Sequence, residues 1–222
     1  MSTLIFPSII SSIIEACITH PLDVIKIHKQ TNTNIIYKFK NLYSGFIPRA
    51  IGNIPSRSCF LFSQDYLKYI INMSSSSNLQ LWSPLLIPIG TGFAQTLVDT
   101  PVEVKKINKI MNINNNMIYK GFIPHLGRNI IFLISVYNFR QYGEKQNNNI
   151  LTKVIYGSIG GIIGSYISHP LDTIKTHVQI NKNYKKLKLS NYFRGGNMRA
   201  SMSMINMFIS LSIFELIKKY ND

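Results

Sequence analysis

The sequence is short of charge, and of acidic residues in particular. Charged residues make up 15% of its 222 positions, against roughly 25% in a typical soluble domain. Only 9 residues are Asp or Glu, against 24 Lys and Arg, and the resulting net charge of +15 excludes an acidic interaction tail or a strongly anionic scaffold. Because 45% of the residues are apolar, we expect a chain that folds but does not turn all of its surface to water.

Cysteine and the common catalytic motifs are scarce as well. The two cysteines, Cys17 and Cys59, show neither a CxxC pattern nor a metal-type spacing, which excludes a disulfide scaffold and a zinc site. The sequence has no HExxH pair, nucleophile elbow or Ser/His/Asp arrangement, and its glycine cluster at 157–164 lacks the spacing of a nucleotide-binding loop. We therefore expect no enzyme, no metal site and no cofactor.

The basic excess fits two classes of protein: a nucleic-acid binder, or a membrane protein with basic loops on one side. Six weakly charged apolar stretches, each close to the ~20 residues that a bilayer requires, favour the second class. They cover approximately residues 3–25, 46–63, 79–104, 121–139, 150–174 and 197–217. Lysines concentrate in the connections after the first, third and fifth stretches. This asymmetry predicts six membrane spans with both termini on the side opposite the basic loops.

Several charged residues interrupt these stretches. At mid-membrane each would cost about 2.5–3.5 kcal/mol, so we expect them to face a watery interior rather than lipid. They are Glu15, Arg57, Asp99, Arg128, Arg140 and Arg199. Six helices around a polar cavity is the arrangement that they predict.

A motif of the form Pro-x-acid-x-x-base occurs three times, each time at the end of an odd-numbered stretch. The copies run from Pro21 to Lys26, from Pro101 to Lys106 and from Pro170 to Lys175. An aromatic-x-Gly element follows each copy and opens the next even-numbered stretch; these elements end at Gly45, Gly121 and Gly195. The sequence thus predicts three copies of helix, basic loop and helix, over residues 1–78, 79–147 and 148–222, which together make one domain.

This pattern, over essentially the whole chain, resembles the mitochondrial carrier family. The resemblance implies an all-α membrane protein whose six transmembrane helices, in three pseudosymmetric repeats, surround a central cavity. It also implies a multi-pass location in the mitochondrial inner membrane, with the basic loops in the matrix, and we expect a functional monomer. Only 20 to 25 residues separate each motif proline from the following glycine, too few for the full matrix helix of the family. The compact, Ile-, Asn- and Lys-rich chain is similar to carrier-like proteins of large DNA viruses, whose membrane would be that of a host.

The repeated motif predicts a gate. Proline kinks a helix, so three kinked helices can lean together and close one end of the cavity. Acid and base, three residues apart, can reach different neighbouring helices. Threefold symmetry then predicts the pairs Asp23 with Lys106, Glu103 with Lys175, and Asp172 with Lys26, as a gate on the matrix side. In the family a glutamine braces such pairs; Gln30 and Gln179 match it, and Ile110 departs from it.

The opposite gate is less regular. Twenty residues past the three glycines stand Asp65, Gln141 and Glu215. The segment with Glu215 and Lys218 matches the family's aromatic-acid-x-x-base motif, but in the middle copy Glu144 stands where a base is expected. We therefore expect a weak cytoplasmic-side gate that opens easily, made of Asp65, Lys68, Gln141, Glu144, Glu215 and Lys218.

Polar residues on the even-numbered stretches indicate the cargo. A polar stripe at helical spacing on each of them contains an arginine: Arg57, Arg128 and Arg199. Guanidinium groups bind carboxylates or phosphates and keep their charge, so the expected substrate is a small anion. The resemblance implies further substrate contacts seven and eight residues past each glycine: Gly52 with Asn53, Arg128 with Asn129, and Met202 with Ser203.

Several substrate classes remain open. Arg128 followed by a polar residue looks like carriers of keto acids or other carboxylates, whereas Arg49, Arg57, Arg128 and Arg199 together suit a phosphate chain. We favour exchange of a nucleotide or deoxynucleotide by alternating access. A keto-acid, carboxylate or phosphate carrier is the alternative, and a basic nucleic-acid-binding protein is a distant one. Glu15 could couple a proton or hold an arginine, and we favour the second role.

Overall fold

The protein is built from helices. The computed structural model describes residues 5–35, 37–74, 76–114, 116–146, 149–185 and 187–221, without the side chains of 5–8, 150, 210–211 and 214–221, and no strand occurs in these ranges. The six long helices are α1 (Ile5–Thr31), α3 (Phe46–Met73), α4 (Ser77–Met111), α5 (Phe122–Gln146), α6 (Ile150–Gln179) and α7 (Gly196–Asn221). Each apolar stretch of the sequence falls on one of them, so the prediction of six helices is confirmed.

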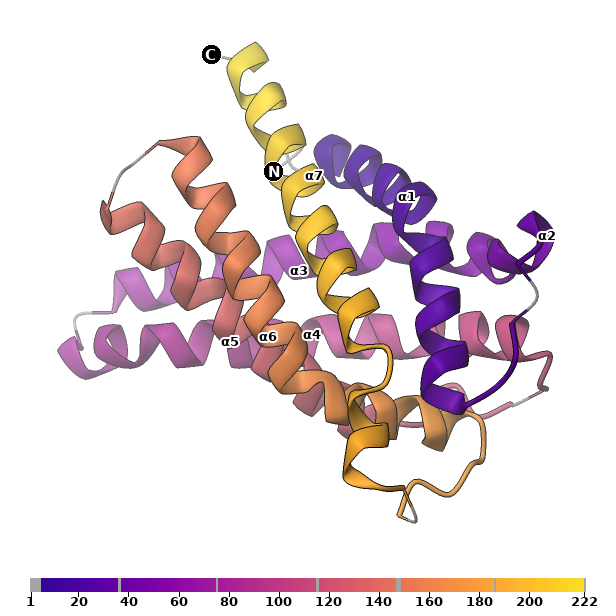
Figure 1. The fold of residues 1–222 in the computed structure, drawn as a ribbon. Helices are drawn as coiled ribbons and strands as arrows, with labels where there is room; N and C mark the ends of the chain where they lie inside the picture. The colour runs from indigo at the N-terminus through magenta and orange to yellow at the C-terminus, as the bar shows by residue number, and fades with distance from the viewer. Residues whose placement is uncertain are drawn as a thin grey trace.

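The six long helices form a closed ring. Each packs beside the next along the chain, and α1 also packs against α7. In Figure 1 the helices α1, α4 and α6 end toward the right and lower right, where the connections to α3, α5 and α7 gather, while the turns after α3 and α5 lie at the left. All three motif copies are therefore brought to the same end of the bundle.

The long connections hold little helix of their own. In their described parts we find only α2 (Phe39–Leu42) and a short 3₁₀ helix, η2 (Leu189–Phe193). The connections are thus as short as the spacing between proline and glycine predicts. By length and composition, one helix in the described ranges, α4, is apolar enough to cross a membrane, and one such helix is weak evidence for a membrane protein.

The turns that open α3, α5 and α7 share one backbone conformation. Gly45, Gly121 and Gly195 have φ angles of 78°, 77° and 83°, in the left-handed region that favours glycine. A Cβ atom at these positions would lie 2.9, 3.4 and 3.2 Å from the backbone oxygens of Lys106, Lys175 and Lys26, respectively. Each aromatic-x-Gly turn therefore packs against the motif lysine of another copy, which explains why the glycine is needed.

Candidate functional site

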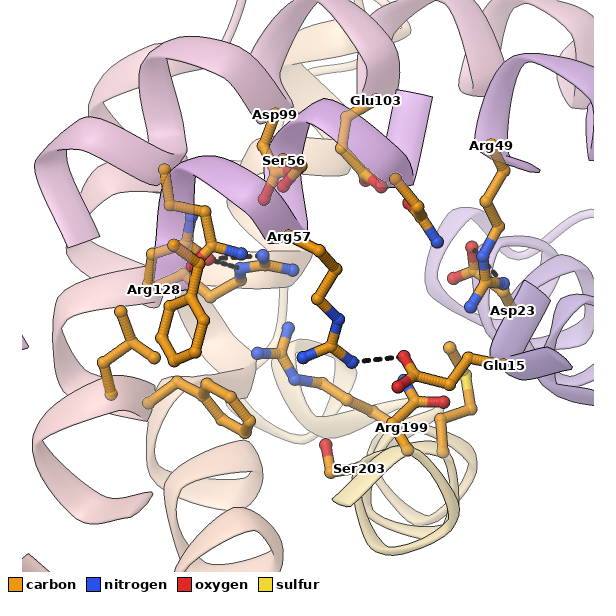
Figure 2. A pocket seen from close by; sticks show the side chains of 18 of the residues that line it. Glu15, Asp23, Arg49, Ser56, Arg57, Asp99, Glu103, Arg128, Arg199 and Ser203 are labelled. Carbon is orange, nitrogen blue, oxygen red and sulfur yellow. Dashed lines mark hydrogen bonds and ion pairs between the residues drawn. The ribbon is translucent and has the colours of Figure 1, made fainter. Parts of the chain in front are cut away.

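A polar cavity lies inside the ring of helices (Figure 2). Its volume is about 200 Å³. Six cationic side chains line it, namely Lys26, Arg49, Arg57, Lys106, Arg128 and Arg199. Four acidic side chains also line it: Glu15, Asp23, Asp99 and Glu103. Six positive and four negative groups leave a fixed charge of +2 on the cavity wall.

The acids and bases of the three motifs form a ring of ion pairs at one end of the cavity. Lys106 Nζ lies 2.7 Å from Asp23 Oδ2, Lys175 Nζ lies 2.6 Å from Glu103 Oε2, and Lys26 Nζ lies 3.1 Å from Asp172 Oδ2. These are the three pairs that threefold symmetry predicts. Each lysine also contacts the acid of its own motif. Five of the six side chains are at most 6% exposed, and that of Glu103 is 19% exposed. The ring is therefore continuous and nearly dry.

Arginines extend the ring into the cavity. Asp172 Oδ1 accepts ion pairs from Arg199 Nη1 at 2.8 Å and from Arg128 Nη1 at 3.2 Å. Arg49 Nη1 lies 3.3 Å from Asp23 Oδ2. These arginines, which the sequence analysis assigns to the cargo, thus also neutralise carboxylates of the ring. Burying so many charges costs free energy, and the ion pairs and hydrogen bonds offset that cost.

The two glutamines that follow the motif make different contacts. Gln30 Nε2 donates a hydrogen bond to Asp172 Oδ2 at 2.9 Å, and its Oε1 accepts one from Thr176 at 3.0 Å. Gln30 therefore touches a ring carboxylate, as the predicted brace should. Gln179 Nε2 donates instead to the backbone oxygen of Lys120 at 3.2 Å, in the turn before α5. Ile110 belongs to an apolar cluster with Val24, Ile27, Ile107 and Ile180.

Most of the expected substrate contacts line the cavity. They are Asn53, Arg57, Arg128, Asn129, Arg199, Met202 and Ser203. Gly52 is the exception and corrects our prediction. It is buried where α3 meets α4, and a Cβ atom there would overlap the side chain of Val102. Gly52 therefore permits close helix packing rather than contact with a substrate.

Two of the cavity arginines are held in place by neighbours. Arg57 pairs with Glu15, so α3 is joined to α1, and the arginine-holding role that we favour for Glu15 is present. Arg128 Nε donates to Asn129 Oδ1 at 3.0 Å, and Asn129 Nδ2 donates to Thr96 Oγ1 at 2.9 Å. Such a network fixes the orientation of a guanidinium group before any ligand arrives.

The sequence analysis missed Gln95, which extends a polar face of the cavity. Gln95 lines it together with Asp99 and Glu103, and the three residues are spaced four apart on α4. The sequence analysis expected Asp99 to face the interior and Glu103 to belong to the gate, but it did not name Gln95 or group the three residues. Residues four apart share a helix face, so the stripe was visible in the sequence. An apolar wall of Phe60, Phe132, Leu133, Met202 and Met207 completes the cavity.

The structure describes four side chains of the predicted cytoplasmic-side gate, those of Asp65, Lys68, Gln141 and Glu144. Gln141 Nε2 donates to the Tyr137 hydroxyl at 2.9 Å, and Lys68 Nζ lies 5.5 Å from the centroid of the same ring. Glu144 Oε1 is 3.5 Å from Arg140 Nε on its own helix, at the surface. Asp65 is exposed. The side chains of Glu215 and Lys218 lie outside the described residues. Among the described side chains at this end, no ion pair links two helices.

Comparison with known proteins agrees with the geometry. The sequence profile of the mitochondrial carrier protein family matches residues 146–194. The mitochondrial 2-oxodicarboxylate carrier of Rattus norvegicus is 26% identical in an alignment of 220 positions that covers 76% of this chain and 72% of that protein. The mitochondrial aspartate-glutamate transporter of Saccharomyces cerevisiae is 21% identical in an alignment of 276 positions that covers 95% of this chain and 30% of that protein.

A viral protein is also similar. A mitochondrial carrier-like protein of Acanthamoeba polyphaga mimivirus is 28% identical over 106 residues, which cover 46% of this chain and 45% of that protein. These matches agree with three Pro-x-acid-x-x-base motifs whose side chains meet in one ring. In sequence and in its repeated motifs, the chain is similar to members of the mitochondrial carrier family.

Proposed function

We propose that the protein exchanges small dicarboxylate anions across the mitochondrial inner membrane by alternating access. Two of the relatives named above are named for anionic cargo, a 2-oxodicarboxylate carrier and an aspartate-glutamate transporter. The observation that carries the finer proposal is the charge of the cavity. A wall with six cations and four acids carries an excess of positive charge that favours an anionic substrate, and guanidinium groups bind carboxylates in bidentate fashion.

Cavity size also favours a small substrate. Pockets for drug-sized ligands measure roughly 300–1,000 Å³, whereas this cavity measures about 200 Å³. A dicarboxylate of five or six carbons suits that volume better than a nucleotide does. The relatives named for their cargo carry 2-oxodicarboxylates or aspartate and glutamate. The keto-acid and carboxylate alternative of the sequence analysis therefore replaces the nucleotide as the favoured substrate class.

The outer surface supports the placement in a membrane. Large apolar side chains are exposed at four-residue intervals along α4 and α6, on the faces opposite the polar cavity. They are Leu85, Ile89, Phe93 and Leu97 on α4, and Ile155, Ile159, Ile163 and Ile167 on α6. Contiguous exposed apolar surface of this kind marks contact with lipid or a partner. We infer six spans in three repeats, 1–78, 79–147 and 148–222, with the lysine-rich connections in the matrix.

The geometry suggests how exchange proceeds. The ring of ion pairs closes the matrix end, so substrate enters from the opposite side and meets Arg57, Arg128 and Arg199. Its carboxylates compete with Asp172 for Arg128 and Arg199. Opening the ring breaks buried ion pairs, and the substrate must supply the differential binding energy that makes this possible. An empty carrier lacks that energy and stays closed, which makes exchange obligatory.

Uptake into liposomes that contain the purified protein tests the proposal. We expect saturable uptake of labelled dicarboxylates and little uptake of nucleotides, deoxynucleotides or phosphate. Arg128→Ala should lower dicarboxylate uptake about tenfold to a hundredfold, because it removes a charge-assisted contact. Arg140→Ala is the matched control, since Arg140 lies on the same helix but outside the cavity. Preferred uptake of nucleotides, or no saturable uptake together with salt-sensitive DNA binding, would overturn the proposal.

A further inference from the structure

Asp99 lines the cavity beside a single polar partner. It lies on α4, four residues before Glu103, and its Oδ1 accepts a hydrogen bond from the Ser56 hydroxyl on α3. Figure 2 shows the two side chains next to each other at the cavity wall, near Glu103 and above Arg57. The hydrogen bond occupies one carboxylate oxygen and leaves Oδ2 available to a ligand.

The other acids of the cavity wall are all neutralised by cations. Glu15 pairs with Arg57, Asp23 with Lys106, and Glu103 with Lys175. No ion pair joins Asp99 to any side chain in the described part of the chain. The nearest cations belong to other acids, because Lys175 pairs with Glu103 and Arg128 pairs with Asp172.

A half-buried carboxylate without a cation is unfavourable, and a ligand that brings a positive group can supply the missing partner. The arginines and lysines of the same cavity offer sites for two carboxylates. The whole wall is therefore complementary to a molecule with two negative groups and one positive group. An amino dicarboxylate is such a molecule.

We propose that Asp99, held by Ser56, binds the ammonium group of a 2-amino dicarboxylate and thereby sets a preference for amino over oxo substrates. The inference rests on the proposed function as a dicarboxylate carrier and specifies its substrate. An ammonium group donates three hydrogen bonds to acceptors such as Asp99 Oδ2. A 2-oxo group only accepts hydrogen bonds, so beside Asp99 it places an acceptor against an acceptor and leaves both without a donor. The named relatives include carriers of both classes, and in this chain Asp99 favours the amino class.

Three substrates that differ only at C2 test this role in proteoliposomes: L-glutamate, glutarate and 2-oxoglutarate. We expect L-glutamate to be taken up with the highest kcat/KM and 2-oxoglutarate with the lowest. In Asp99→Asn the charge is lost and the amide can donate to an oxo group, so the ratio of L-glutamate to 2-oxoglutarate should fall about tenfold or more. Arg140→Ala, outside the cavity, should leave the ratio unchanged.

Several results would overturn the assignment. The first is a preference of the wild-type protein for 2-oxoglutarate over L-glutamate and glutarate. The second is an equal decrease in the uptake of L-glutamate and of 2-oxoglutarate in Asp99→Asn. The third is a change in Asp99→Asn of the pH dependence of uptake alone. If the variant does not fold, the order of the three substrates on the wild-type protein decides the question. If 2-oxoglutarate is taken up and L-glutamate is not, only the role of Asp99 is ruled out. No uptake of any of the three defeats the proposed function itself.

Discussion

Among the residues of the ion-pair ring, the three carboxylates are not equivalent. Asp172 accepts contacts from Lys26, Lys175, Arg128 and Arg199, whereas the ion pairs of Glu103 are with Lys106 and Lys175. The lysine partners followed from the sequence because the motif repeats at fixed spacing. The arginine partners did not, because the reach of a long side chain depends on how the helices are rotated against one another.

This asymmetry predicts unequal losses of stability. Asp172→Asn should lower the free energy of unfolding by about 3–5 kcal/mol, since it leaves several buried cations facing one another. Glu103→Gln should cost less, and Glu144→Gln, at an exposed pair, should change it by no more than about 1 kcal/mol. Thermal unfolding in detergent measures all three. Equal transition temperatures for Asp172→Asn and Glu144→Gln would show that the ring does not hold the structure together.

Two adjacent glycines offer a matched pair of substitutions. Gly195 has a φ of 83° and lies against the backbone of Lys26, while Gly196 begins α7 and has room for a Cβ atom at 3.4 Å or more from its neighbours. Gly195→Ala should therefore destabilise the protein by about 1 kcal/mol or more, and Gly196→Ala should be neutral or stabilising. Calorimetric melting of the two variants compares them directly. The same melting temperature for both would contradict the strained turn.

At the scale of helices, the apolar stretches of the sequence predicted the positions of all six long helices. The helices α1, α4 and α6, which hold the odd-numbered stretches, continue past the ends of these apolar stretches into lysine-rich sequence. Polar residues such as lysine also form helix. The short elements α2 and η2 were not predicted, since four or five residues carry no usable periodicity. Contacts between helices were harder still to predict from the sequence. Gly52 fits the family's position for a substrate contact, yet α4 approaches so closely there that Val102 fills the space.

The contact between α3 and α4 gives a prediction of its own. Gly52→Ala should destabilise the bundle, because the new methyl group overlaps Val102. Val102→Ala removes part of the obstacle, so the double variant should be more stable than the sum of the two single effects predicts. A double-mutant cycle from denaturant unfolding measures this coupling. Strict additivity, or a change in substrate preference in Gly52→Ala, would restore Gly52 to the substrate site.

For the whole molecule, the net charge of +15 divides between two tasks. Exposed lysines such as Lys38, Lys109 and Lys188 lie in or next to the three long connections, where in our proposal they orient the protein in the membrane. Buried lysines and arginines form the ring and the cavity wall. Composition alone could not separate these groups, because burial depends on which helix faces turn inward. The motifs predicted the ring, while the cavity's balance of charge, and with it the favoured substrate, required the structure.

Obligatory exchange is the central claim, and counter-transport in proteoliposomes tests it most directly. Uptake of a labelled dicarboxylate is measured into vesicles that contain an unlabelled dicarboxylate, a nucleotide or no solute. We predict saturable uptake only when dicarboxylate is inside, and its loss in Arg128→Ala but not in Arg140→Ala. Equal uptake into empty vesicles, or uptake driven by internal nucleotide and not by dicarboxylate, would contradict the account.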